Sequence, residues 1–376
     1  MRAALISLTE GHLKLAGKTL ARRQLDFALA AGCESVIVLG DGASAEAIAL
    51  RHAAEGAGAR FQAIRDSHGL LGAVRADDEL LALAPGLLPE APAALEALKS
   101  RAVLVLPAGP GVAAGFERID LERAWAGALV VGGAQVERLS DLAADIEPAS
   151  ALVRIALQAR VPERRLPEEV LADGSWALPG SDPAATEQAW LKRHAPAGRP
   201  FAPTEWLGRL ALRPLAGRLL AMPRAVEGLT LAAVAVLSGA ILTSWCGWSA
   251  PGFALVAVGA LLTEAAAGLM RLRHAPFAGA RRIDFAPLFP WLVDGAIFAC
   301  AVLAIKLLFP PLVLLGTLHA LRRVTLSNWA LLPSDRGLIA ALLAVAAAFG
   351  VVELAIMLLA LGLIALNVAQ SRAERG

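Results

Sequence analysis

The chain has 376 residues, of which 57% are hydrophobic and 18% are charged. Soluble globular proteins contain about 45–50% apolar and about 25% charged residues, so this composition excludes both a wholly soluble protein and a disordered one. Residues 1–200 carry 25 acidic and 21 basic residues, whereas residues 201–376 carry 8 and 14. An acidic first half, in a chain without tyrosine, also argues against a nucleic-acid partner.

Residues 1–178 have the pattern of a cytosolic α/β domain. Helical stretches are predicted at residues 19–31 and at residues 44–57, for which Ser44 is a suitable N-cap. With the intervening strands, they predict a mainly parallel, doubly wound sheet that binds ligands beyond the carboxyl ends of its strands. The predicted strands are short apolar runs at residues 3–8, 35–39, 60–64, 79–84, 102–106 and 128–131.

The loop after the first predicted strand carries the residues best suited to bind phosphate. It lies before a helix, where backbone N–H groups can hold an anion, and it contains Gly11, Lys14 and Lys18. Five residues separate Gly11 from Gly17, one more than in the phosphate loop of ATPases. No apolar strand ends directly in an aspartate that would bind magnesium, so an ATPase is not expected.

Residues 3–42 resemble the start of sugar-nucleotide and cytidylyl transferases. The resemblance rests on a strand, a loop, the Gly17-Lys18 turn, a helix and the run AAGCESVIVLG at residues 30–40. It continues weakly to about residue 176 and implies a Rossmann-like fold of the nucleotidyltransferase type. In that family the first loop binds the triphosphate, and an aspartate after a central strand holds Mg²⁺.

Both of these elements are reduced in this chain. Only Gly11, Lys14 and Lys18 remain of the triphosphate loop, and the strand at residues 79–84 runs into proline and glycine. Nucleotidyl transfer needs positioned phosphates and a cation, so the resemblance implies a nucleotidyltransferase fold with a dismantled active site. We interpret the remaining acids of this region as solvated carboxylates, although in principle they could replace the missing one: Asp41, Asp66, Asp77 and Asp78.

Two connecting segments follow the α/β domain. Residues 179–204 are rich in proline, glycine and alanine, which is typical of a linker, with one short helix near residues 183–193. Residues 205–224 have apolar side chains at helical spacing with arginines among them, so they predict an interfacial amphipathic helix on the cytoplasmic headgroups. Pro214 would kink that helix.

Residues 225–370 form the predicted transmembrane domain, because a spanning helix needs about 20 mostly apolar residues. The apolar runs lie at residues 226–245, 253–272, 288–309, 311–321 and 338–369, and the last is divided by Gly350 into a hairpin, which makes about six helices. Loops on one side carry the arginines, so positive-inside counting places both termini in the cytoplasm. These are Arg271, Arg273, Arg281, Arg282, Arg322, Arg323, Arg336, Arg372 and Arg375.

Glu264 and Asp294 stand out as acids within these apolar runs. Intramembrane acids are costly and usually face a cavity or a partner, which makes both of them functional candidates. A structural reading is equally open, in which Glu264 pairs with an arginine such as Arg271 and Asp294 lies near the headgroups.

The order of a nucleotidyltransferase-like domain, a linker, an amphipathic helix and six spans resembles a family of bifunctional enzymes. These enzymes fuse a cytidylyltransferase to a CDP-alcohol phosphatidyltransferase, as in inositol-phosphate phospholipid synthesis. Their membrane site is D-x-x-D-G-x-x-A-R, followed by a glycine and D-x-x-x-D, and its acids bind a divalent metal and the CDP pyrophosphate. In the matching stretch of this chain Glu264 and Gly268 fit the pattern, whereas Ala267 replaces the second aspartate.

Asp284 and Asp294 lie close to the second half of that pattern but out of register. The resemblance therefore implies Glu264, Gly268, Asp284 and Asp294 as catalytic candidates. It implies that Arg271 and Arg273 bind the pyrophosphate. With so few oxygen donors, we expect no metal site; Mg²⁺ or Mn²⁺ would bind only if the chain is an active enzyme.

Three functions follow from these patterns. The first is a non-catalytic scaffold or partner subunit in phospholipid or sphingolipid head-group synthesis, working as a homodimer or beside an active enzyme. The second is an active CDP-alcohol phosphatidyltransferase with atypical metal ligands, and the third is a transporter with a regulatory cytosolic domain. The first apolar run is too short for a signal peptide, and the Ala/Leu/Arg bias suggests a bacterium, so we expect the bacterial inner membrane.

Overall fold

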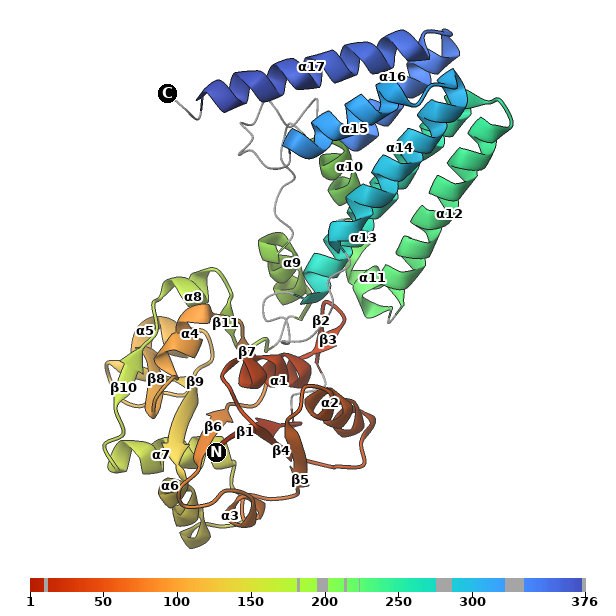
Figure 1. The fold of residues 1–376 in the computed structure, drawn as a ribbon. Helices are drawn as coiled ribbons and strands as arrows, with labels where there is room; N and C mark the ends of the chain where they lie inside the picture. Colours follow the sequence, from red (N-terminus) through yellow and green to blue (C-terminus); the bar gives the residue numbers. More distant parts are fainter. Residues whose placement is uncertain are drawn as a thin grey trace. The chain divides into compact units, whose positions relative to one another are not determined.

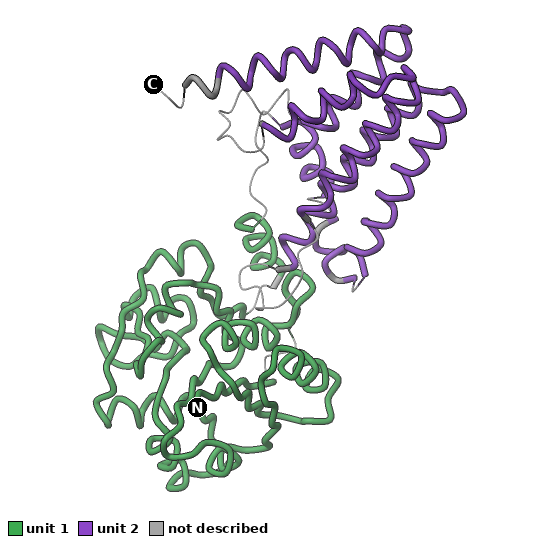
Figure 2. The backbone as a smooth tube through the Cα atoms, in the orientation of Figure 1, with its two compact units in different colours: residues 1–194, 274–282 green, residues 195–273, 283–376 purple. Residues whose placement is uncertain are grey.

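The structure, a computed structural model, describes residues 1–9, 13–180, 183–194, 202–212, 215–222, 224–274, 286–321 and 335–373. It divides into two compact units (Figure 2). The α/β unit comprises residues 1–194 and 274–282, and the helical unit comprises residues 195–273 and 283–376. The predicted site residues Gly11 and Asp284 and the predicted kink at Pro214 lie outside the described residues.

A seven-stranded sheet forms the centre of the α/β unit, in the order β10-β8-β9-β6-β1-β4-β5 (Figure 1). Strand β9 is antiparallel to both of its neighbours, and the other pairs are parallel. The predicted mainly parallel α/β sheet is thus confirmed. The strands are β1 (Arg2–Ser7), β4 (Ser35–Leu39), β5 (Arg60–Ile64), β6 (Glu79–Leu83), β8 (Ala102–Pro107), β9 (Arg123–Gly132) and β10 (Glu163–Arg165).

Two strands differ from the prediction. Strand β9 has 10 residues, and the apolar run at residues 128–131 is only its second half, because an arginine and a glycine interrupt the earlier part. The edge strand β10 was not predicted, since its three residues are all charged and exposed. Exposed edge strands lack the apolar pattern from which strands are recognised.

The strand order reverses at β1. Strands β4 and β5 lie on one side of β1, and β6 lies on the other. Ala4 of β1 is in register with Val36 of β4 and with Leu81 of β6, and all three side chains are buried. In open parallel sheets the ligand crevice lies outside the carboxyl ends of the strands at such a reversal. By this rule the ligand crevice is expected between the loops that follow β1 and β6.

Helices α1 (Leu20–Ala30) and α2 (Ala45–Gly56) confirm the predicted helices, and Ser44 Oγ accepts the Ala47 N–H at 3.1 Å as an N-cap. A small hairpin of β2 (Lys14–Leu15) and β3 (Lys18–Thr19) precedes α1. Helix α9 (Pro183–His194) confirms the predicted short helix and packs on β2. The remaining elements are α3 (Gly69–Ala73), β7 (Leu88–Pro89), α4 (Pro92–Ala97), α5 (Ala108–Ala113), α6 (Gly133–Glu137), α7 (Pro148–Gln158), α8 (Glu169–Ala172) and β11 (Trp176–Ala177).

The helical unit contains a shared apolar core. Side chains from α12 to α17 meet in it, among them Leu237, Phe253, Val293, Leu314, Ile339 and Ile356. The pairs α12 with α14 and α15 with α17 run side by side (Figure 1). The helices are α10 (Pro203–Leu212), α11 (Ala216–Ala221), α12 (Ala225–Trp245), α13 (Ser249–His274), α14 (Phe289–Ile305), α15 (Phe309–Leu321), α16 (Arg336–Ala348) and α17 (Val352–Ala373).

Three helical segments in the described residues are long and apolar enough to cross a membrane: Ala225–Trp245, Ser249–Arg273 and Val352–Ala369. Helices α14, α15 and α16 are apolar but shorter, so six complete spans remain a prediction. The apolar run predicted at residues 288–309 is longer than the helix that forms there. Lys306 adopts a left-handed backbone conformation (φ +55°), which ends α14. Gly350, at φ +73°, separates α16 from α17 and confirms the predicted division of the last run.

Candidate functional site

Lys14 and Lys18, the phosphate-binding candidates, lie on the β2–β3 hairpin. Lys14 is exposed, whereas Lys18 Nζ lies 3.0 Å from one carboxylate oxygen of Asp26. Arg22 Nε lies 3.1 Å from the other oxygen. Burial lowers the pKa of Lys18, and the attraction of Asp26 opposes this only in part. The Lys18 ammonium thus already has an anionic partner within the chain.

The turn after β6 has no acid in the position where the resemblance implies a metal ligand. Gly86 lies in this turn with φ +70°, a backbone conformation that favours glycine over aspartate. Asp78, one of the possible replacements, precedes β6 and therefore lies at the opposite end of the strand. Its carboxylate is 3.1 Å from the N-terminal ammonium of Met1, and hydrogen bonding by the Arg75 backbone keeps its pKa low. Asp78 is therefore a structural ion-pair partner.

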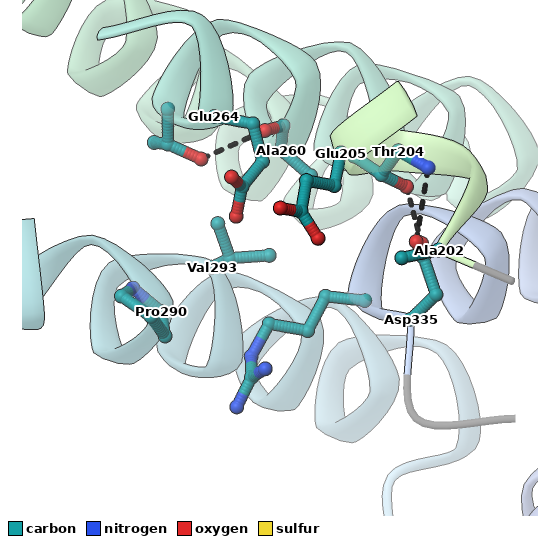
Figure 3. Close-up of a pocket in the computed structure, with 10 residues that line it drawn as sticks. Ala202, Thr204, Glu205, Ala260, Glu264, Pro290, Val293 and Asp335 are labelled. Carbon is teal, nitrogen blue, oxygen red and sulfur yellow. Dashed lines mark hydrogen bonds between the residues drawn. The ribbon is translucent and has the colours of Figure 1, made fainter. Parts of the chain in front are cut away.

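The helical unit contains a cavity of about 130 Å³ between α10, α13, α14 and the start of α16 (Figure 3). Glu205 of α10 and Glu264 of α13 direct their carboxylates into it. Glu264 is therefore a predicted site residue that reaches a cavity, as intramembrane acids often do. The lining residues are Ala202, Thr204, Glu205, Ala260, Thr263, Glu264, Pro290, Val293, Asp335 and Arg336.

Asp335 closes one end of this cavity by joining α10 to α16. One carboxylate oxygen accepts the Thr204 N–H at 2.9 Å, and the other accepts the Thr204 hydroxyl and the Leu338 N–H. Asp335 is thus the N-cap of α16 and an anchor for α10 at the same time. The prediction missed this role, although an aspartate directly before an apolar helical run is a signal for an N-cap.

Asp294 is buried in the helical unit and has a cation beside it. Arg336 donates to its two oxygens at 2.7 and 3.0 Å. His319 of α15 approaches Asp294 Oδ2 to 3.9 Å, and its ring lies against the Trp291 ring at 4.1 Å between centroids. Asp294 is 2% exposed and does not line the cavity. It therefore lies among side chains of the bundle, and its position relative to the headgroups stays a prediction.

The other candidates of α13 lie on successive turns of that helix. Arg271 Nη2 is 3.7 Å from Glu264 Oε2, which is the pairing that the structural reading predicted. Arg273 Nη1 lies 3.7 Å from the Glu227 carboxylate on α12. A side chain at Gly268 would meet Leu212 at 3.3 Å, so this glycine allows α10 to pack closely on α13. Each of these residues thus has a contact within the unit.

Over the described residues, no group of three His, Cys, Asp or Glu side chains is arranged to hold a metal ion. Asp294 is engaged by Arg336, and Glu264 and Glu205 are the carboxylates that line the cavity besides the Asp335 anchor. A divalent cation usually takes about six oxygen ligands, several of them carboxylate. Glu205 is paired with Arg209, and Glu264 lies 3.7 Å from Arg271, so the two glutamates of this polar cavity supply few ligands.

The fold defines a class of protein: an α/β sheet domain followed by a bundle of apolar helices, of which three within the described ranges are long enough to cross a membrane. No protein family matches the chain, and no curated protein is significantly similar to it.

Proposed function

We propose that this chain is a non-catalytic membrane protein of phospholipid or sphingolipid head-group synthesis, in which it serves as a scaffold or partner subunit. The observation that carries the proposal is the pair formed by Asp294 and Arg336. Asp294, which is 2% exposed, is bound on both oxygens by a cation of the same chain, so neither oxygen is left for a metal ion without displacing Arg336. A bidentate arginine–carboxylate pair is geometrically specific and strong.

Membrane insertion is supported by the outer surfaces of the helices. On α12, Leu231, Leu242 and Trp245 are 70%, 67% and 75% exposed. Apolar side chains of this size on one continuous helix face suit a lipid bilayer better than water. The proposal includes six spans, cytoplasmic termini and the bacterial inner membrane, for which the support is the distribution of arginine in the sequence.

The experiment is genetic complementation joined to an activity assay. Deletion of the gene in its host is expected to change the head-group composition of the lipids, and the Glu264→Gln variant is expected to restore it as fully as the unchanged chain. The matched control is Thr263→Ser on the same helix. Rescue by unchanged protein but not by Glu264→Gln would contradict a non-catalytic role.

The purified protein in nanodiscs provides the second arm. It is expected to show no Mn²⁺ binding by electron paramagnetic resonance and no turnover of CDP-alcohols with a radiolabelled lipid acceptor. A co-purifying phosphotransferase should lose activity when this chain is removed. Metal-dependent turnover by the purified chain would overturn the proposal.

A second candidate function is an active CDP-alcohol phosphatidyltransferase that uses atypical ligands. It is favoured by one observation, the meeting of Glu205 and Glu264 in a single cavity (Figure 3). In that case Mg²⁺ or Mn²⁺ would be required, and Arg271 or Arg273 would contact the pyrophosphate. Turnover that is lost in Glu264→Gln and retained in Thr263→Ser would favour this candidate.

A further inference from the structure

Helix α9 is held on the α/β unit by a buried carboxylate. Glu90 follows β7, and its side chain is 1% exposed. It accepts a hydrogen bond from Trp190 Nε1 at 2.8 Å and pairs with Arg193, both on α9. Arg23 of α1 binds the same carboxylate at 2.5 Å and lies 4.5 Å over the Trp190 ring. Side chains from α1, from α9 and from the segment after β7 thus meet at the buried Glu90 carboxylate.

A second contact involves a carboxylate of α9 itself, which reaches the segment between β1 and α1. Glu187 Oε1 accepts the backbone N–H of Ala16 at 3.2 Å. Ala16 and Gly17 both have positive φ (+49° and +78°), so the loop turns sharply at the contact. The two residues form the turn of the β2–β3 hairpin, and successive main-chain N–H groups in such a turn can bind phosphate oxygens. Here the Ala16 N–H donates instead to the Glu187 carboxylate of the same chain.

These contacts fall on the two loops that border the crevice at the strand reversal. Ala16 belongs to the loop after β1, and Glu90 belongs to the segment after β6. Gln24 of α1, the helix that follows the hairpin, donates to the Ala84 and Leu87 carbonyls and so holds α1 on the turn after β6. Helix α9 therefore lies over the place where open parallel sheets bind their ligands.

We propose that α9 is an intramolecular occupant of this crevice, with Glu187 in the place of a phosphate group, and that a phosphate-bearing ligand binds there only when α9 leaves. Basic side chains outnumber acidic ones around it, which suits an anion: the hairpin and α1 carry Lys14, Lys18, Arg22 and Arg23 against Asp26 of α1 and Glu90 of the segment after β7. The inference goes beyond the function proposed for the helical unit and does not depend on it.

The test uses the full chain in nanodiscs and pyrophosphate as the probe. Two variants release α9 by different means, Glu187→Ala at the loop and Trp190→Ala at the buried carboxylate. The matched controls are Gln188→Ala and Lys192→Ala, which truncate exposed side chains of the same helix. Hydrogen exchange follows α9 and the β2–β3 hairpin, and calorimetry follows pyrophosphate binding.

We expect faster exchange of α9 in both release variants and at least a 10-fold lower dissociation constant for pyrophosphate, whereas both controls match the unchanged chain. Undiminished protection of β1 and β4 would show that the sheet is folded in each variant. Faster exchange of α9 without a gain in pyrophosphate affinity would overturn the proposal. Exchange of α9 in the unchanged chain as fast as in an unstructured peptide would also overturn it.

Discussion

Arg336, at the start of α16, holds Asp294 of α14 through two hydrogen bonds of 2.7 and 3.0 Å. The residue before Arg336, Asp335, caps the same helix and binds Thr204 of α10. Two consecutive residues therefore connect α16 to two other helices. This arrangement makes the start of α16 the principal polar junction that the structure describes in an otherwise apolar bundle.

Loss of one partner of the Asp294–Arg336 pair is expected to be costly. Replacing Arg336 by methionine leaves a buried carboxylate without a cation and should destabilise the bundle by about 3–5 kcal/mol. The double variant Asp294→Leu with Arg336→Met should recover most of that loss, because no unpaired charge remains. Unfolding in detergent titrated with SDS provides the measurement. A double variant as unstable as the single one would show that the pair itself contributes the stability.

A methyl group at Gly337 is expected to disrupt the junction between α10 and α16. An added Cβ would lie 2.2 Å from the Thr204 hydroxyl, so either the Thr204–Asp335 contact breaks or the helices move apart. Overpacking of this kind costs about 1–3 kcal/mol. Gly295→Ala is the control, since nothing lies within 4 Å of an added Cβ there. Hydrogen exchange of α10 should rise for Gly337→Ala and stay unchanged for Gly295→Ala; equal exchange in the two would contradict the close packing.

Cysteine labelling tests the proposed topology with native residues. Cys246 is exposed after α12, whereas Cys33 and Cys300 are buried, and burial raises the pKa of Cys33 to about 12. Because thiolates are the reactive form, a membrane-impermeant maleimide applied to intact cells is expected to label Cys246 alone. Cys246→Ser should abolish labelling. Labelling that requires disruption of the inner membrane would place the α12–α13 loop in the cytoplasm and reverse the proposed orientation.

The docking of α9 is expected to weaken in mild acid. Burial lowers the pKa of His194 below its ordinary value of 6.5, and the positive charges of Arg193 and Arg23 lower this pKa further. The Glu90 carboxylate acts in the opposite direction. Docked α9 therefore binds fewer protons than released α9, and docking is lost progressively as pH falls below about 6.5. Exchange of α9 amides at pH 5.5 and 7.5, corrected for intrinsic rates, should reveal the loss. His194→Gln should remove the pH dependence; tighter docking at pH 5.5 would contradict this prediction.

Much of the fold was predictable because its signals are local. The run SVIVL at β4 has only apolar side chains after its first residue, and Ser44 begins α2 with a hydroxyl that caps it. Gly350 ends α16 since it adopts a positive φ between two apolar stretches. The predictions were wrong where the apolar pattern was missing, as in the charged edge strand β10. They were also wrong where the backbone conformation of one residue ended a helix early, as at Lys306.

The candidate site was harder to foresee than the fold. The sequence singles out Glu264 and Asp294 equally, as acids in apolar helices, yet one lines a cavity and the other is bound to Arg336. Arg336, which binds Asp294, and most of the residues that line the cavity beside Glu264 lie on other helices than the acid concerned. Asp335 and Trp190 carry contacts that no spacing rule relates to Thr204 or Glu90.

By itself the sequence determined where most of the apolar helices and strands form and which segments are apolar enough for a membrane, because these follow from side chains close together in the chain. Only the tertiary structure decided which charges are paired. Arg336 and Asp294 are 42 residues apart, and Trp190 and Glu90 are 100 apart. Such pairs form because burial makes an unpaired charge costly, and burial is a property of the packed chain.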